Sequence, residues 1–221
     1  MLNLKKILFG GGAASELVQD VRSALEQWQS LPVPRLDDLH YHVRYVVVDV
    51  ATGGQGGEGD QLKALAASSV QHSMIVPGDT FYADLEAAEE DTAAVDRRLM
   101  AFLQYAAKSP LVTYHVPYVG AYLKQIYRER LGIEFEAQWV DLAWLLPAMF
   151  EEKCHTVMPL DHWIELFGLN AGQGRRDAMD NNLLLARIFQ MLLVRVVGKQ
   201  IDTAERLVDE SRASRFLRRT H

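Results

Sequence analysis

A strand that carries an acid near its end is the sequence feature that most limits the possible folds. Residues 45–54 read Tyr-Val-Val-Val-Asp-Val-Ala-Thr-Gly-Gly, an apolar run that stops at two glycines. Because side chains alternate faces along a strand, Asp49 and Ala51 point to one side and Val50 points back into the core. Two carboxylates at this spacing can hold divalent metal ions together, but here only the first residue is acidic. The strand therefore indicates a metal-dependent enzyme, or a fold that has lost this chemistry.

The composition restricts the class of protein. The chain has 221 residues, of which 49% are hydrophobic, so it is long enough to bury one full core. Its formal net charge of -6 argues against a sequence-independent polyanion binder, which would present a basic face. The single Cys154 cannot form an internal disulfide, and no Cys/His cluster has the spacing of a zinc site. No uninterrupted apolar run has the length of a membrane span and no signal-peptide pattern opens the chain, so no membrane contact and a cytoplasmic location are expected.

The order of extended and helical patterns predicts the fold class. Residues 1–40 are expected to form a helical extension and a linker, residues 41–198 one domain, and residues 199–221 a C-terminal helix. Strands are expected from residue 43 and over 62–70 and 73–84, which in succession predict an antiparallel meander. The further elements predicted are helices around 99–106, after Pro117, and over 142–150, 160–166, 177–197 and 203–217, with short strands at Leu111–Thr113 and Trp139–Asp141. This order predicts an α/β protein, a mixed five-stranded sheet with helices on both faces.

A glycine-rich segment follows the first strand. Residues 53–60 read Gly-Gly-Gln-Gly-Gly-Glu-Gly-Asp and lead into another strand. A phosphate-binding P-loop would end in Gly-Lys-Ser/Thr and open a helix, so this segment fails both tests. A connection between two paired strands is expected instead.

Three segments resemble the motifs of the DEDDh 3′–5′ exonucleases, the DnaQ-like type to which the proofreading epsilon subunit of DNA polymerase III belongs. Residues 45–54 are similar to the first motif, an apolar strand followed by Asp-x-Glu, Thr and Gly. Leu111–Leu123 is similar to the second motif, and residues 175–182 to the third, in which a His precedes an Asp by five residues. The order and spacing of the motifs agree over residues 43–193, so the resemblance implies an RNase H-like fold.

The resemblance also implies a chemistry that this sequence mostly lacks. In that family, four carboxylates hold two divalent ions and a His accepts a proton from the attacking water. One functional position of five is retained, Asp49, which remains a weak candidate metal ligand. The glutamate, second aspartate, histidine and last aspartate positions are occupied here by Ala51, Val119, Arg176 and Asn181. Arg cannot act as a base in a protein, and Asn is a poor ligand for a hard cation.

Other residues near the motifs have expected roles. In the family, the backbone just after the first motif approaches the terminal nucleotide, so Thr52 and Gly53 are candidate nucleotide-binding residues. Arg176 is expected to pair with Asp49 and to neutralise an otherwise lone carboxylate. Asp141 is expected to tie down the segment that follows the last strand. The residues that could replace the lost groups are His115 as a base and Asp177, Asp180, Glu58 and Asp60 as metal ligands. A structural role is favoured for His115, and a one-residue shift on a helix turns Asp177 and Asp180 off the site face by ~100°.

The sequence thus predicts a catalytically degenerate 3′–5′ exonuclease homologue. It would be a non-catalytic subunit that binds a protein partner or another copy of itself, or weakly a single-stranded nucleic acid, and no cofactor is expected. Two alternatives stay open. One is an active exonuclease with a rearranged Mg²⁺ or Mn²⁺ site. The other is a metal-free nucleotide sensor that uses the same pocket.

Overall fold

A five-stranded mixed sheet forms the centre of the protein. The computed structural model describes residues 17–53, 61–86, 91–169 and 176–219. The strand order is β3-β2-β1-β4-β5, where β1 (Tyr45–Thr52), β2 (Leu62–Gln71) and β3 (Met74–Asp84) form an antiparallel meander. The short strands β4 (Leu111–Thr113) and β5 (Trp139–Asp141) continue the sheet in parallel with β1. The predicted meander and the predicted α/β class are both confirmed.

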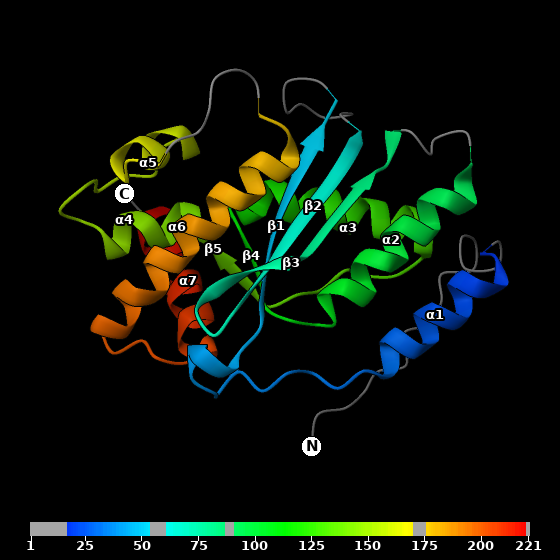
Figure 1. The fold of residues 1–221 in the computed structure, drawn as a ribbon, viewed down its shortest axis with the longest axis horizontal. Coiled ribbons are helices and arrows are strands. Elements are labelled where there is room, and N and C mark those ends of the chain that lie inside the picture. The colour runs from blue at the N-terminus through cyan, green and yellow to red at the C-terminus, as the bar shows by residue number, and fades with distance from the viewer. Residues whose placement is uncertain (1–16, 54–60, 87–90, 170–175, 220–221) are drawn as a thin grey trace.

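Helices cover both faces of this sheet, as predicted (Figure 1). On one face lie α1 (Gln19–Ser30), α2 (Thr92–Ala106) and α3 (Val116–Leu131). The opposite face carries α4 (Leu142–Met149), α5 (Leu160–Leu166), α6 (Ala178–Gly198) and α7 (Ala204–Arg219). A short 3₁₀ helix, η2 (His40–His42), precedes β1. The glycine-rich connection expected at residues 53–60 lies outside the described residues beyond Gly53.

Alternation along β1 produces two separate cores. Val46, Val48 and Val50 pack on the side of α2 and α3, while Tyr45 and Val47 pack on the side of α6. Asp49 and Ala51 follow Tyr45 and Val47 in the alternation, so they face α6. The sheet therefore delivers positions 49 and 51 to the space next to the start of α6.

Helix α6 crosses the sheet and has two different faces. With 21 residues and a mean hydropathy of 1.3 over its most apolar 18-residue stretch, α6 is long and apolar enough to span a membrane. It is the one helix of the described ranges with this property, and half of that stretch is buried inside the protein. Its buried residues pack on the sheet, and Asn182, fully buried, donates from Nδ2 to the carbonyl oxygens of Val47 and Ala66. The helix is thus fixed to β1 and β2 close to Asp49.

Candidate functional site

The first and third motif segments meet at the carboxyl end of β1. A cavity of about 510 Å³ lies there, lined by the end of β1, by Tyr82 of β3 and by the start of α6. Its lining residues are Val50, Ala51, Thr52, Tyr82, Arg176, Asp177, Ala178 and Asn181. The fold therefore brings the first and third motifs to one place.

Asp49 is the acid that the first motif places at this end of the sheet. Burial is the largest influence on its carboxyl and raises its pKa to about 6, because a charged carboxylate is costly away from water. The backbone N–H of Val50, the side chain of Asn181 and the charge of Arg176 act in the opposite direction, and they offset only part of the rise. Asp49 is thus an acid that takes up a proton near neutral pH.

Arg176 reaches Asp49 through Asn181. Its Nε donates to Oδ1 of Asn181 at 2.7 Å, and its Nη2 donates to Asp161 in an ion pair. Because Oδ1 of Asn181 already accepts from the guanidinium, its amide nitrogen is the group left to donate to Asp49. The expected direct pair between Arg176 and Asp49 is therefore wrong, since the carboxylate that pairs with Arg176 belongs to Asp161 of α5.

The residues after Asp49 line the cavity without offering it free polar groups. Ala51 presents a methyl group at the position where the family has a carboxylate. The hydroxyl of Thr52 lies 2.9 Å from the hydroxyl of Tyr118 on α3. The N–H of Gly53 donates to the carbonyl of Gln61, and a side chain added at Gly53 would meet the aliphatic part of Lys63. The proposed nucleotide role of Thr52 and Gly53 remains a prediction, and their groups have partners within the protein.

Val119 does not line the cavity. It lies on α3, is 1% exposed and belongs to the core between α2, α3 and the sheet. The second motif therefore contributes its residue to packing, and the side chain of α3 that reaches the end of β1 is Tyr118.

Asp141 has the structural role that the sequence predicts. Its carboxylate accepts from the backbone N–H groups of His115, Val116 and Ala143, so it joins β5 to the starts of α3 and α4. These bonds hold His115 in a left-handed conformation with φ of 69°. The His115 side chain is exposed and does not line the cavity.

The two described acids that could rescue a metal site are engaged in a helix cap. Asp177 and Asp180 form a reciprocal cap at the start of α6, in which each carboxylate accepts from the other residue's backbone N–H. This use explains their position at the helix terminus. Asp177 also lines the cavity, whereas Glu58 and Asp60 lie outside the described residues.

This set of donors does not fit a pair of divalent cations. A hard cation takes several oxygen ligands, and of the family positions only Asp49 has a carboxylate. Asn181 uses its carbonyl oxygen for Arg176, whose fixed positive charge opposes a cation nearby. In the part of the chain that the structure describes, no group of three or more His, Cys, Asp or Glu side chains is arranged to hold a metal ion.

The sequence left two contributors to the site unidentified. Asp161 lies on α5, 15 residues before its partner Arg176, and nothing in the local pattern around residue 161 marks it. Tyr118 follows Pro117 on the apolar side of a helix and reads as a core residue. A hydroxyl that meets Thr52 could be recognised only once α3 and β1 are placed next to each other.

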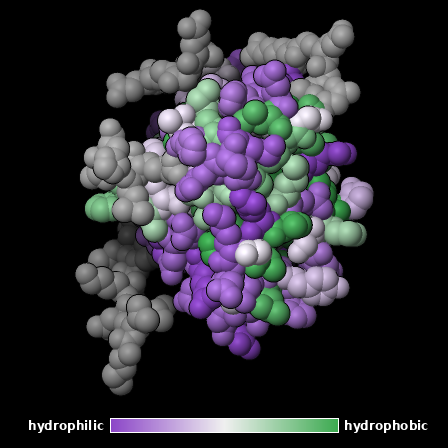
Figure 2. Space-filling model, turned by 90° about the vertical axis from the view of Figure 1, so that its left-hand side faces the viewer, coloured by the Kyte–Doolittle hydropathy of each residue, from purple (hydrophilic) through white to green (hydrophobic). Residues whose placement is uncertain are grey.

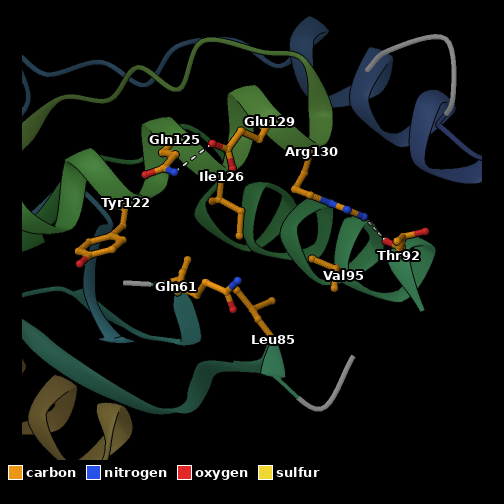
Figure 3. A pocket seen from close by; sticks show the side chains of 10 residues that line it. Gln61, Leu85, Thr92, Val95, Tyr122, Gln125, Ile126, Glu129 and Arg130 are labelled. Atoms are coloured by element: carbon orange, nitrogen blue, oxygen red, sulfur yellow. Dashed lines mark hydrogen bonds between the residues drawn. The ribbon is translucent and has the colours of Figure 1, made fainter. Parts of the chain in front are cut away.

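A second cavity, of about 400 Å³, lies on the other side of the sheet (Figure 3). It is formed mainly by α3 and the start of α2. Its polar groups bind one another: Gln125 donates to Glu129, while Arg130 donates to Asp96 and to the carbonyl of Thr92. The ion pair with Asp96 leaves this cavity without an unpaired cation.

Comparison with known proteins identifies a fold. No protein-family model matches the chain, and no curated protein matches it. Two solved structures are similar to it, each at 14% identity over 71% of this chain. One is the nuclease domain of 3'hExo, a DEDDh family member, bound to rAMP, with 94% of that chain covered and a TM-score of 0.54. The other is cell-death related nuclease 4 (CRN-4), with 66% covered and a TM-score of 0.52. The chain therefore has the RNase H-like fold of the DEDDh exonucleases.

Proposed function

We propose that this chain is a catalytically inactive homologue of the 3′–5′ exonucleases and acts as a non-catalytic subunit. The observation that carries the proposal is the hydrogen bond from Arg176 to Asn181, two residues that line the cavity at the end of β1 and that both act on the pKa of Asp49. It puts a guanidinium and an amide beside the one retained acid, where metal-dependent hydrolysis needs carboxylates and a base. Ala51 and the buried Val119 stand at two further carboxylate positions of the family, and neither side chain can bind a metal ion.

The size of the expected loss supports an inactive protein. Losing a residue that only supports a metal ligand typically costs ~10–100-fold in metal affinity or activity, and losing a ligand should cost at least as much. Three lost ligands that act independently would amount to ~10³–10⁶-fold. The general base is missing as well, because Arg176 stands at its position.

The charges around the cavity disfavour a nucleotide sensor at this place. Arg176 is the cation that could hold a phosphate, but Asp161 already pairs with it. Asp177 lines the same cavity and Asp49 stands behind Asn181. A phosphate would meet more negative than positive charge here.

A nuclease assay tests the proposal. The protein is incubated with 5′-labelled single-stranded DNA and RNA in Mg²⁺ or Mn²⁺, in parallel with an Asp49→Ala variant purified in the same way. We expect no shortening of either strand beyond the rate of the variant, since the carboxylates that would hold the ions are absent. Shortening from the 3′ end by the wild type that the variant lacks would establish the active exonuclease instead.

The outer face of α6 supports a role in protein contacts. Four apolar residues are exposed along it, Leu183 (38%), Met191 (36%), Val194 (75%) and Val197 (54%). Figure 2 shows the side of the molecule on which α4, α5 and the end of α6 lie, and this side is mainly hydrophilic, with apolar residues in small groups. Apolar residues that recur on one exposed helix face are typical of a helix that packs against a partner.

We propose a second copy of the chain as the partner of this face. In an antiparallel pair of α6 helices centred on Gln190, residue numbers that add to 380 lie opposite each other. Leu183 then meets Val197 of the partner subunit, and Asp180 lies near Lys199 of the partner subunit. The face is therefore complementary to itself at these two contacts, while Arg187, also exposed on this face, lies near Val194 of the partner subunit.

Replacing Val197 with Glu is expected to abolish this association, because it places a charge against Leu183 and near Asp180 of the partner subunit. Light scattering after size exclusion should give a mass of two chains for the wild type at roughly 100 µM and of one chain, 24.9 kDa, for the variant. Ala121→Glu, on the exposed side of α3, is the control and should remain dimeric. A wild-type protein with the mass of a single chain at that concentration would contradict the pairing.

A further inference from the structure

A third cavity lies at the opposite end of the sheet from Asp49. It has a volume of about 460 Å³ and is formed where the amino ends of β4 and β5 meet α1, α3, α7 and the chain after α2. Leu111 and Trp139, the first residues of β4 and β5, line it, and Leu111 pairs with Val46 near the start of β1. Nothing in the exonuclease-like motifs accounts for this cavity.

Positive charge exceeds negative charge in its lining. Lys108, Lys124 and Arg212 are the cations and Glu136 is the acid. Lys108 donates to the carbonyls of Gln29 and Leu31 and makes no ion pair within the described ranges. Lys108 is therefore held by backbone carbonyls, and the two other cations of the cavity are Lys124 and Arg212.

The side chains of Lys124 and Arg212 are available to contact a ligand. Lys124 is exposed on α3 and, among the described residues, has no carboxylate within ion-pair distance. Arg212 donates to Oε1 of Gln138 at 2.7 Å and lies 3.4 Å from Asp209, an exposed pair on α7. Exposed pairs of this kind contribute little, so Arg212 can exchange Asp209 for an anion at small cost.

Aromatic side chains supply the walls of the same cavity. Trp28, Phe135 and Trp139 line it, and the ring centroids of Phe135 and Trp139 are 6.3 Å apart. The ammonium of Lys108 lies 5.3 Å from the centre of the Trp28 ring and fixes that indole. The Nε1 group of Trp28 is buried and has no hydrogen-bond partner in the described structure, so one donor is unsatisfied.

The other two cavities lack this combination. The cavity in Figure 3 has no unpaired cation, because Arg130 forms an ion pair with Asp96. The cavity beside Asp49 has its cation paired with Asp161. Of these three cavities, the third alone combines an excess of cations over acids with two indole rings.

We propose that this third cavity binds a nucleotide, with the base against the indoles of Trp28 and Trp139 and the phosphate at Lys124 and Arg212. Stacking on aromatic rings combined with cations for the phosphate is the usual chemistry of base and phosphate recognition. The volume is within the range of small-molecule sites. The site is independent of the proposed function, since it shares no residue with the cavity at Asp49.

Calorimetric titration of the full chain with AMP tests the proposal. We expect saturable binding that weakens by about tenfold or more in Lys124→Glu, because a charge-assisted contact to phosphate becomes a repulsion. Lys153→Glu makes the same charge change at an exposed position after the end of α4, outside this cavity, and should bind AMP as the wild type does. Arg212→Gln, which keeps a hydrogen-bonding side chain, is a second variant and should also weaken binding.

Further ligands test whether base and phosphate are both recognised, and whether the nucleotide is free or at the end of a strand. Adenosine and ribose 5-phosphate should each bind more weakly than AMP, because each lacks one half of the recognised group. A 5′-phosphorylated oligonucleotide that binds more tightly than AMP would assign the site to the end of a strand, and the reverse order would assign it to the free nucleotide. Either order supports the site.

Three results would overturn it. These are no binding of AMP up to roughly 5 mM, equal affinity in the wild type and both variants, or a loss of binding in Arg176→Ala but not in Lys124→Glu. The last result would move the nucleotide to the cavity beside Asp49. None of the three depends on whether the protein cleaves nucleic acid, so the nuclease assay and this titration can fail separately.

Discussion

Val119→Asp is expected to lower the free energy of unfolding by about 3–5 kcal/mol, although it restores an acid that the resembled family has at this position. Val119 is 1% exposed and packs in the core between α3 and the sheet. An ionised carboxylate there has neither water nor a cation as a partner, so the folded state must bury a charge or protonate it. Since a domain of this size is stable by about 5–15 kcal/mol, the variant would lose a large part of its stability.

Urea unfolding at neutral pH measures this loss, with two controls. Val119→Ala removes only packing and should cost less than the aspartate. Ala121→Asp places the same acid on the exposed side of α3 and should cost under about 1 kcal/mol, close to its helix propensity. A Val119→Asp protein as stable as the wild type, whose stability increases further with Mn²⁺, would show that position 119 faces a metal site and not the core.

Asp49→Asn is expected to stabilise the protein above pH 6. The pKa of Asp49 is raised from 3.8 to about 6 by burial, so the folded state prefers the protonated acid. The stability that this proton contributes is fully present below about pH 4 and is lost as the pH rises through about 6. Asparagine has the shape of aspartate without its charge, so the free energy of unfolding of Asp49→Asn should exceed that of the wild type by on the order of 2–3 kcal/mol at pH 8.

The stabilisation by Asp49→Asn should increase as the pH rises. Urea unfolding of the wild type and the variant should give a difference that is largest at pH 8 and shrinks toward zero as the pH falls to about 4. Asp209→Asn removes an exposed charge on α7 and should show no comparable gain. A variant that is less stable than the wild type at pH 8 would mean that the ionised carboxylate is held by stronger contacts than those of Val50, Asn181 and Arg176.

Most of the fold could be predicted because its signals are local. The alternation of apolar residues in β1 and the composition of β2 and β3 predict strands whose bounds the structure matches within a few residues. The short strands Leu111–Thr113 and Trp139–Asp141 coincide with the prediction, since each lies between helices that bury it on both sides. The first helix, α1 (Gln19–Ser30), lies within the helical extension and linker expected over residues 1–40.

The site was predictable only in part, because its contacts join distant segments. Motif spacing places Asp49, Arg176 and Asn181 together, and the cavity at the end of β1 agrees with that placement. Motif spacing does not reveal that Arg176 donates to Asn181 and not directly to Asp49. One turn of α6 decides which of these side chains is nearest to Asp49. Asp161 attracts Arg176 away from Asp49, and no local pattern connects α5 with α6.

Buried polar groups were the other feature that the sequence did not predict. Asn182 occupies a position that reads as one of two adjacent polar residues at a helix start, yet it is fully buried and binds two carbonyl oxygens of the sheet. His40 likewise is buried, with its ring nitrogens at Tyr45 and at the carbonyl of Ile201. Burial lowers the pKa of His40, so its contribution to stability is present above its ordinary pKa and is lost as the pH falls below it.

Calorimetric titration with Mn²⁺ tests the central claim, that the site at Asp49 no longer holds metal. The wild type and Asp49→Ala are titrated side by side at pH 7.5, above the raised pKa of Asp49, so that protonation does not mask a ligand. We expect no saturable binding in either protein up to roughly 5 mM Mn²⁺. Uptake of one or two ions by the wild type that disappears in Asp49→Ala would contradict it.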